Sequence, residues 1–161
     1  MKRTIVPAIV LVALVSLLPA RTAGARGGAL TAASAGPFLL HEIAEKTEGH
    51  WAAAWRTLYP ANQRVAPLAA YVRCEASSPF PASFQGATVE GIKPGPVAVP
   101  GLALPVEGVA VAIQVQLAGF FGPRDPIVFR HTFHVVPVAG RWTWLLSIPS
   151  YRAYSHGGCA G

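Results

Sequence analysis

The residue best suited to chemistry is His131, in the stretch "IVFRHTFHVVPV" (127–138). Phe129 and Phe133 lie two positions away on either side, so an extended strand places all three side chains on one face. Burial on that face would favour a neutral imidazole, which can donate or accept a proton. The alternative is a pocket-wall histidine that hydrogen-bonds to a neighbour, and the lack of a carboxylate on this face favours it.

Few other residues suit acid–base chemistry. In the strand-forming half the carboxylates are Glu90, Glu107 and Asp125, which fall at strand ends or in a turn, where side chains are typically solvated. Tyr71 and Glu107 are the candidate helpers if His131 acts as an acid or base. The sequence has no nucleophile elbow, phosphate-binding glycine loop or dinucleotide fingerprint. We therefore expect no cofactor.

The two cysteines predict a disulfide rather than a metal site. Neither has a second ligand at zinc-site spacing, and His134 points to the opposite face from His131, so the two histidines cannot share an ion. A bond between Cys74 and Cys159 would close a loop of about 85 residues and stabilise the fold by roughly 4 kcal/mol. A pair of free thiols is the alternative.

Four tryptophans could stack on a ligand or fill the core. Trp51 and Trp55 are four residues apart, as on one helical face, and Trp142 and Trp144 alternate, as on one strand face. This spacing favours packing. If the core encloses a pocket, its predicted wall is aromatic and consists of Trp51, Trp55, Phe129, His131, Phe133 and Trp144.

The N-terminus predicts export. Lys2 and Arg3 precede the apolar run "TIVPAIVLVALVSLLPA", and "AGA" at Ala23–Ala25 has the form that signal peptidase accepts. We expect a signal peptide over 1–25 with cleavage near Ala25, a flexible leader over 26–36, and a single domain over 37–161. The alternative, a retained membrane anchor, is disfavoured because the run is short and contains a proline.

The domain begins with helices and continues with strands. Apolar residues from Pro37 to Leu58 recur at three- and four-residue steps, Tyr59-Pro60 ends this stripe, and Pro67 starts a second helix that reaches Cys74. Between them "PANQRVA" is expected to be a turn. Alternating patterns predict strands over 105–119, 127–138 and 141–149, preceded by an extended segment broken by three prolines. This order predicts an α+β fold, with N-terminal helices packed on a curved antiparallel sheet.

The charge excludes a nucleic-acid partner. Cleavage after residue 25 leaves ten basic and seven acidic residues, and the arginines are scattered singly along the chain. After cleavage we also expect no membrane association. The partners that remain are a small apolar ligand, an envelope protein or a second copy of the chain.

Two stretches resemble a known superfamily. The run "EGHWAAAWRTLYP…YVRC", with Gly49 and Trp55, and the closing strand "GRWTW", with Trp142 and Trp144, resemble the nuclear transport factor 2-like (SnoaL-like, cystatin-like) superfamily over about residues 37–150. The resemblance implies an exported bacterial member shaped as a cone, whose helices and concave sheet enclose an apolar pocket.

Three functions follow as hypotheses. We expect a non-catalytic module that binds a ligand in the cone or a partner protein, because the acidic residue common in enzymes of this superfamily is missing from the predicted pocket. The alternatives are an exported lyase, isomerase or hydrolase that uses His131, and a structural dimerisation module.

Overall fold

The computed structural model describes residues 30–78, 84–119 and 122–159 and confirms the predicted α+β fold. Helices precede a four-stranded antiparallel sheet, and one more helix follows it. The elements are η1 (Ala32–Ser34, a 3-10 helix), α1 (Ala35–Thr47), α2 (Trp51–Arg56), α3 (Pro60–Val65), α4 (Leu68–Ser77), β1 (Phe84–Val97), β2 (Val106–Gly119), β3 (Gly122–Val138), β4 (Arg141–Trp144) and α5 (Ile148–Ser155).

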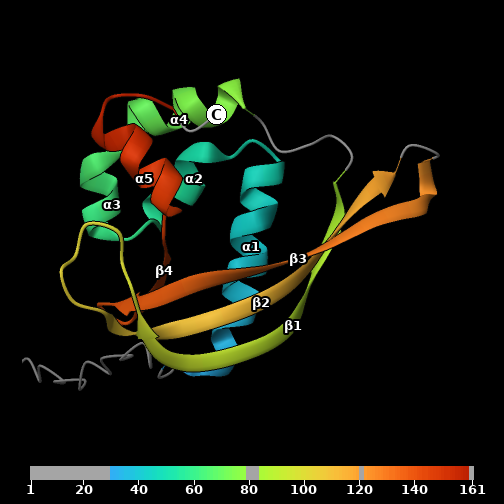
Figure 1. Ribbon diagram of the computed structural model, residues 1–161, viewed down its shortest axis with the longest axis horizontal. Helices are drawn as coiled ribbons and strands as arrows, with labels where there is room; N and C mark the ends of the chain where they lie inside the picture. Colours follow the sequence, from blue (N-terminus) through green and yellow to red (C-terminus); the bar gives the residue numbers. More distant parts are fainter. Residues whose placement is uncertain (1–29, 79–83, 120–121, 160–161) are drawn as a thin grey trace, which may run out of the picture.

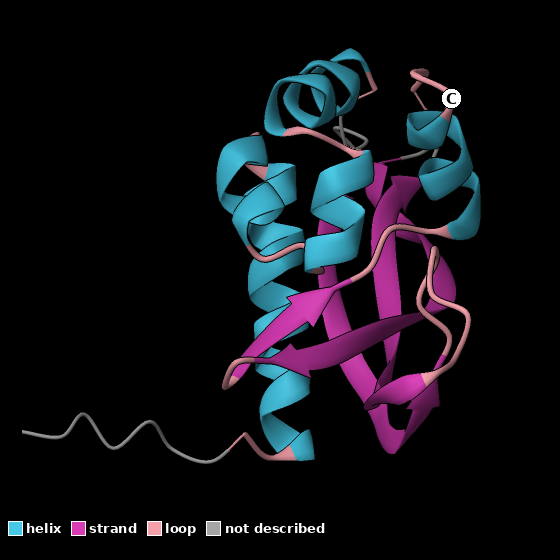
Figure 2. Cartoon of the chain, turned by 90° about the vertical axis from the view of Figure 1, so that its left-hand side faces the viewer, coloured by secondary structure: helices cyan, strands magenta, loops and turns pink. Residues whose placement is uncertain are grey.

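The sheet is a simple meander in the order β1-β2-β3-β4. It curves, and the helices gather on its concave side, with α1 lying across the strands (Figure 1, Figure 2). β2 pairs along its length with both neighbours, whereas β4 pairs with β3 only over Val135–Val138. Among the strands that the structure describes, the remainder of β3 therefore has a neighbour on one side only.

The main core lies between the concave face and the helices. Every second residue of β2 from Val109 to Val115 is buried there, and the fully buried side chains of Leu39, Leu58 and Tyr71 come from the helices. This is the burial that the alternating pattern of β2 predicts. A smaller cluster of Val97, Val99 and Val136 lies on the other face of the sheet, under the chain that follows β1.

The helical stripe is divided as its glycine suggests. Gly49 has φ +79°, a left-handed conformation that favours glycine, and it separates α1 from α2. Pro67 precedes α4 as expected, but the segment expected to be a turn forms α3, because Pro60 occupies the first helical position and suits it.

The strand expected over 141–149 is too long. It ends at Trp144, and Ser147 then caps α5 by accepting a hydrogen bond from the Ser150 N–H at 3.1 Å. The proline-containing segment before β2 forms the edge strand β1, with register shifts beside Gly86 and Gly91, and such edge or bulged pairing is what its prolines predict. Pro94 and Pro96 lie within β1, whereas Pro100 follows it.

The two cysteines form the predicted disulfide. Cys74 in α4 is bonded to Cys159, with 5.3 Å between their Cα atoms. The bond holds the segment after α5 against α4, and such bonds are typical of an oxidising compartment.

The predicted leader is partly structured. Residues 30–36 include η1 and the first two residues of α1, Ala35 is fully buried, and a side chain at Gly36 would lie 3.1 Å from Val89. Contact with the sheet orders a segment that composition alone predicts to be flexible. The predicted signal peptide lies outside the described residues, among which no helix is long and apolar enough to cross a membrane.

Candidate functional site

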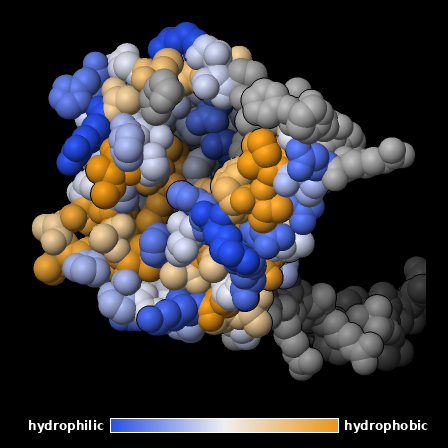
Figure 3. Space-filling model, turned by 45° about the vertical axis from the view of Figure 1, so that its right-hand side comes forward, coloured by the Kyte–Doolittle hydropathy of each residue, from blue (hydrophilic) through white to orange (hydrophobic). Residues whose placement is uncertain are grey.

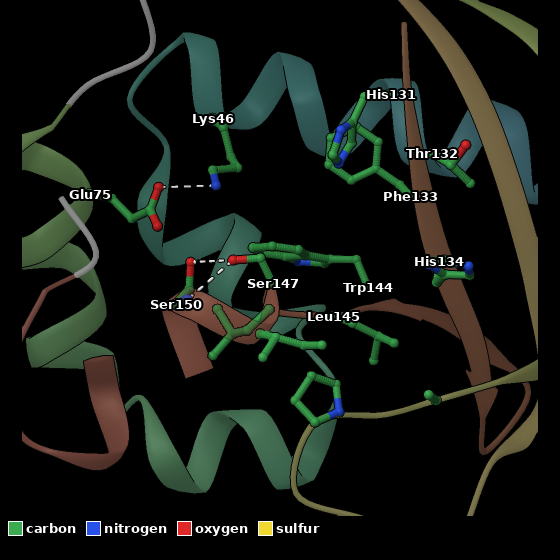
Figure 4. Close-up of a pocket in the computed structure, with 14 residues that line it drawn as sticks. Lys46, Glu75, His131, Thr132, Phe133, His134, Trp144, Leu145, Ser147 and Ser150 are labelled. Atoms are coloured by element: carbon green, nitrogen blue, oxygen red, sulfur yellow. Dashed lines mark hydrogen bonds and ion pairs between the residues drawn. The ribbon is translucent and has the colours of Figure 1, made fainter. Parts of the chain in front are cut away.

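A cleft of about 460 Å³ opens where the free part of β3 meets the end of β4 (Figure 4). Its lining comes from α1, α4, the chain after β1, β3, β4 and the start of α5. The lining residues are Lys46, Glu75, Ala98, Pro100, His131, Thr132, Phe133, His134, Trp144, Leu145, Leu146, Ser147, Ile148 and Ser150.

One wall carries an ion pair above an aromatic ring. Lys46 Nζ lies 3.0 Å from Glu75 Oε2 and 4.9 Å from the centroid of the Trp144 ring. Both charged side chains are mostly buried, so solvent screens the pair less than it would on an open surface. The ammonium–indole contact is attractive because the face of the ring is electron-rich. Together they fix a positive group beside an aromatic surface.

Contacts of both its ring and its backbone fix Trp144 in place. Its indole N–H donates to the carbonyl of Ala54 at 2.9 Å, and its ring meets that of Tyr71 edge to face at 6.2 Å between centroids. Its backbone N–H donates to Thr57 O, and its backbone C=O accepts from the Tyr59 N–H. This residue therefore forms a rigid wall of the cleft.

β3 supplies the opposite wall. The rings of His131 and Phe133 meet edge to face with 4.5 Å between centroids. His134 and Thr132 point to the other face of the sheet, yet they also line the cleft because it runs past the open edge of the strand. The two histidines thus lie on opposite faces, as strand parity predicts, and His131 is exposed rather than buried.

Asn62 connects two loops that border the cleft. It is fully buried, its amide donates to Pro100 O at 3.1 Å, and its side-chain oxygen accepts from the Leu146 N–H at 3.1 Å. A buried amide with both ends paired is a strong positional constraint. It fixes the chain after β1 relative to the chain after β4.

Only half of the six residues predicted to form the pocket wall line the cleft. His131, Phe133 and Trp144 line the cleft. Trp51 and Trp55 pack against the main core instead, and the Trp55 indole donates to Ala66 O at 2.7 Å. Phe129 lies farther along β3 and is exposed. Both helical tryptophans lie in α2, after the break at Gly49, and neither lines the cleft.

The expected catalytic helpers do not reach the cleft. Tyr71 is fully buried, its hydroxyl has no hydrogen-bond partner among the described residues, and burial raises the pKa of its phenol. Glu107 is exposed near the start of β2, opposite Pro96. Neither can assist His131 in proton transfer from these positions.

Lys46, Glu75 and Glu42 were not identified as residues of interest from the sequence. Lys46 of α1 and Glu75 of α4 meet because both helices pack against α2, which no local pattern reveals. Glu42 did leave a signal, because it lies between Leu39 and Ile43 on the apolar face of α1. It is 3% exposed, and its carboxylate accepts from the Thr57 hydroxyl at 2.6 Å.

Burial makes Glu42 sensitive to pH. Desolvation raises the pKa of this carboxyl above 4.5, against the lowering effect of the Thr57 hydrogen bond. Its contribution to stability is therefore fully present below the pKa of the unfolded chain and is lost as the pH rises through the higher pKa of the folded protein.

Glu42→Gln is expected to raise the free energy of unfolding at pH 7 by about 1 kcal/mol, since the amide cannot ionise but still accepts from Thr57. Urea denaturation between about pH 4 and pH 8 measures it, because the difference from wild type should shrink toward the acidic end. Glu48→Gln on the exposed end of the same helix is the matched control and should change little. A constant offset across the pH range would contradict the assignment.

No known family model matches the chain, and no curated protein matches its sequence. Within the described part of the chain, no group of three or more histidine, cysteine, aspartate or glutamate side chains could hold a metal ion. The cleft offers an indole surface, an imidazole and an ammonium group whose charge is balanced by the carboxylate of Glu75. These groups suit recognition of an aromatic or aliphatic molecule that carries one polar group.

Proposed function

We propose that the protein binds a small, largely apolar ligand in this cleft without changing it chemically. The observation that supports this is the rigid indole of Trp144 beside the Lys46 ammonium. A preformed aromatic surface with one oriented charge is a common design of binding pockets. The neighbouring side chains of Phe133, Leu146 and Ile148 add apolar surface.

Catalysis by His131 finds little support in the geometry. Glu75 is the one carboxylate among the described residues that line the cleft, and Lys46 holds it in an ion pair. His131 contacts Phe133, and no carboxylate of the described residues orients its ring or shares its proton. A protein that only binds its ligand needs no carboxylate beside His131.

The proposal includes export and membership of the nuclear transport factor 2-like superfamily. The disulfide supports an oxidising destination, as does the signal-like N-terminal sequence. The helices on the concave side of a curved sheet support the superfamily, together with the positions of Gly49 and Trp55.

A fluorescent probe tests the binding role. 1-Anilinonaphthalene-8-sulfonate carries apolar rings, which match the side chains of Trp144, Phe133 and Leu146 in the cleft. We expect saturable binding of one probe molecule per chain. His131→Ala should weaken it about fivefold, the loss of roughly one aromatic contact.

Phe129→Ala is the matched control, because Phe129 lies on the same strand face but does not line the cleft. It should leave the affinity unchanged. Equal effects of the two substitutions would place the probe outside the cleft. Turnover of any added substrate that disappears in His131→Ala would show an enzyme instead.

A further inference from the structure

The ion pair of Lys46 and Glu75 limits which polar group a ligand can place in the cleft. Their side chains are 23% and 20% exposed, and Lys46 Nζ lies 3.0 Å from Glu75 Oε2. No other lysine, arginine, aspartate or glutamate occurs among the described residues that line the cleft. A ligand that brings a charge therefore finds no free counter-ion, because each charge of the pair already balances the other.

A charged ligand would have to break this pair. A carboxylate that bound Lys46 would leave Glu75 without a partner, and an amine that bound Glu75 would leave Lys46 without one. A mostly buried charge that loses its partner is costly, because solvent replaces the lost interaction only in part. The cleft therefore favours a polar group that leaves the pair intact.

The pair still has hydrogen-bonding capacity for such a group. An ammonium carries three donors, and a carboxylate accepts at two oxygens. Among the described residues, the side chains of Lys46 and Glu75 form no other hydrogen bond or ion pair, and the ammonium also contacts the Trp144 ring. Donors of the ammonium and the second carboxylate oxygen therefore lie side by side next to the indole (Figure 4).

We propose that the ligand of the cleft is an apolar, aromatic molecule whose polar group is a carboxamide. This inference rests on the proposed binding role. A carboxamide presents an acceptor and a donor side by side, so its C=O accepts from the Lys46 ammonium while its N–H donates to the Glu75 carboxylate. Neither charge is displaced, and the attached ring packs against the apolar lining supplied by Trp144 and Phe133.

Three naphthyl compounds test the class of the polar group. Naphthylacetamide, naphthylacetate and naphthylethylamine share one ring system and differ in the charge of that group. Isothermal titration calorimetry should show that wild type binds the amide most tightly, and the acid and the amine at least about tenfold more weakly. In Glu75→Gln the acid should become the tightest ligand, and in Lys46→Met the amine should, because each substitution leaves one charge unbalanced.

Glu90→Gln is the matched control. Glu90 is also paired with a cation, since its two oxygens accept from Arg130 Nε at 2.9 and 2.8 Å, but it does not line the cleft. The substitution changes the net charge by the same amount as Glu75→Gln. It should leave the order of the three affinities as it is in wild type.

Binding at another apolar surface has to be separated from binding in the cleft. Ile127, Val128 and Phe129 are large and exposed, and Figure 3 shows hydrophobic side chains at the surface on the side of the molecule that carries the β2–β3 hairpin. A naphthyl ring bound there would leave the NMR signal of the Trp144 indole N–H in place. A ring bound in the cleft should shift that signal, since Trp144 lines the cleft.

The outcomes separate the ligand class from the binding role. If the Trp144 signal shifts but wild type binds the acid or the amine as tightly as the amide, the carboxamide inference is overturned and the binding role stands. If none of the compounds shifts the signal, both are overturned. An order of affinities that stays the same in folded Glu75→Gln and Lys46→Met would also overturn the inference, and the wild-type order decides if either variant does not fold.

Discussion

Replacing both Cys74 and Cys159 with serine is expected to lower the free energy of unfolding by about 4 kcal/mol. The bond joins residues 85 positions apart, so it removes much conformational freedom from the unfolded chain. It also holds the C-terminal segment in place, where Tyr154 of α5 stacks on the buried Tyr71. Urea denaturation of wild type and the double variant measures the difference.

Reduction provides the control for the serine side chains. Wild type in excess dithiothreitol should unfold at the same urea concentration as the double variant, and the variant should not respond to the reductant. A loss below about 1 kcal/mol would mean that packing of α5 alone holds the C-terminus, contrary to the entropic argument.

Trp144→Ala is expected to destabilise the fold by about 4 kcal/mol, the usual range for removing a buried tryptophan. The substitution empties the space between Tyr71 and Lys46 and leaves the carbonyl of Ala54 without its indole donor. The same residue forms a wall of the cleft, so the loss should be accompanied by loss of probe binding.

Leu104→Ala is the control, since this side chain is 77% exposed and its removal should change stability by less than about 0.5 kcal/mol. Thermal unfolding followed by circular dichroism compares the two variants. A similarly small effect of Trp144→Ala would show that its surroundings collapse around the smaller side chain and that the cleft has no rigid wall.

The sequence was sufficient for the architecture because its periodic patterns are long. The stripe before Tyr59 and the alternation in β2 each extend over many residues, and local period decides element type in such cases. The disulfide also follows from the sequence, since a chain with two cysteines and a predicted signal peptide has one intramolecular pairing available.

Short elements were harder to predict. "RWTWLLSIP" reads as one strand, yet the backbone of Trp144 pairs with the segment around Leu58, and the chain then turns into α5. The signal for that turn was present, because Ser147 is a good N-cap and Pro149 suits a first helical turn. The same proline rule could have identified α3 at Pro60.

Part of the candidate site could be predicted from the sequence. His131 and Phe133 share a strand face by parity alone, so their proximity could be predicted. Lys46 and Glu75 come from helices that both pack against α2, and only this tertiary arrangement sets their 3.0 Å contact. The length of β3 that lies beyond β4 likewise depends on where β4 ends. The strand pattern placed that end at residue 149, whereas β4 ends at Trp144.

The most direct test of the proposed binding site is an NMR titration of the four tryptophan indole N–H signals with 1-anilinonaphthalene-8-sulfonate. The cleft predicts that the Trp144 signal shifts most and saturates at one probe molecule per chain, while the signals of Trp51 and Trp55 stay in place. Shifts confined to Trp51 and Trp55, with Trp144 unmoved, would contradict it.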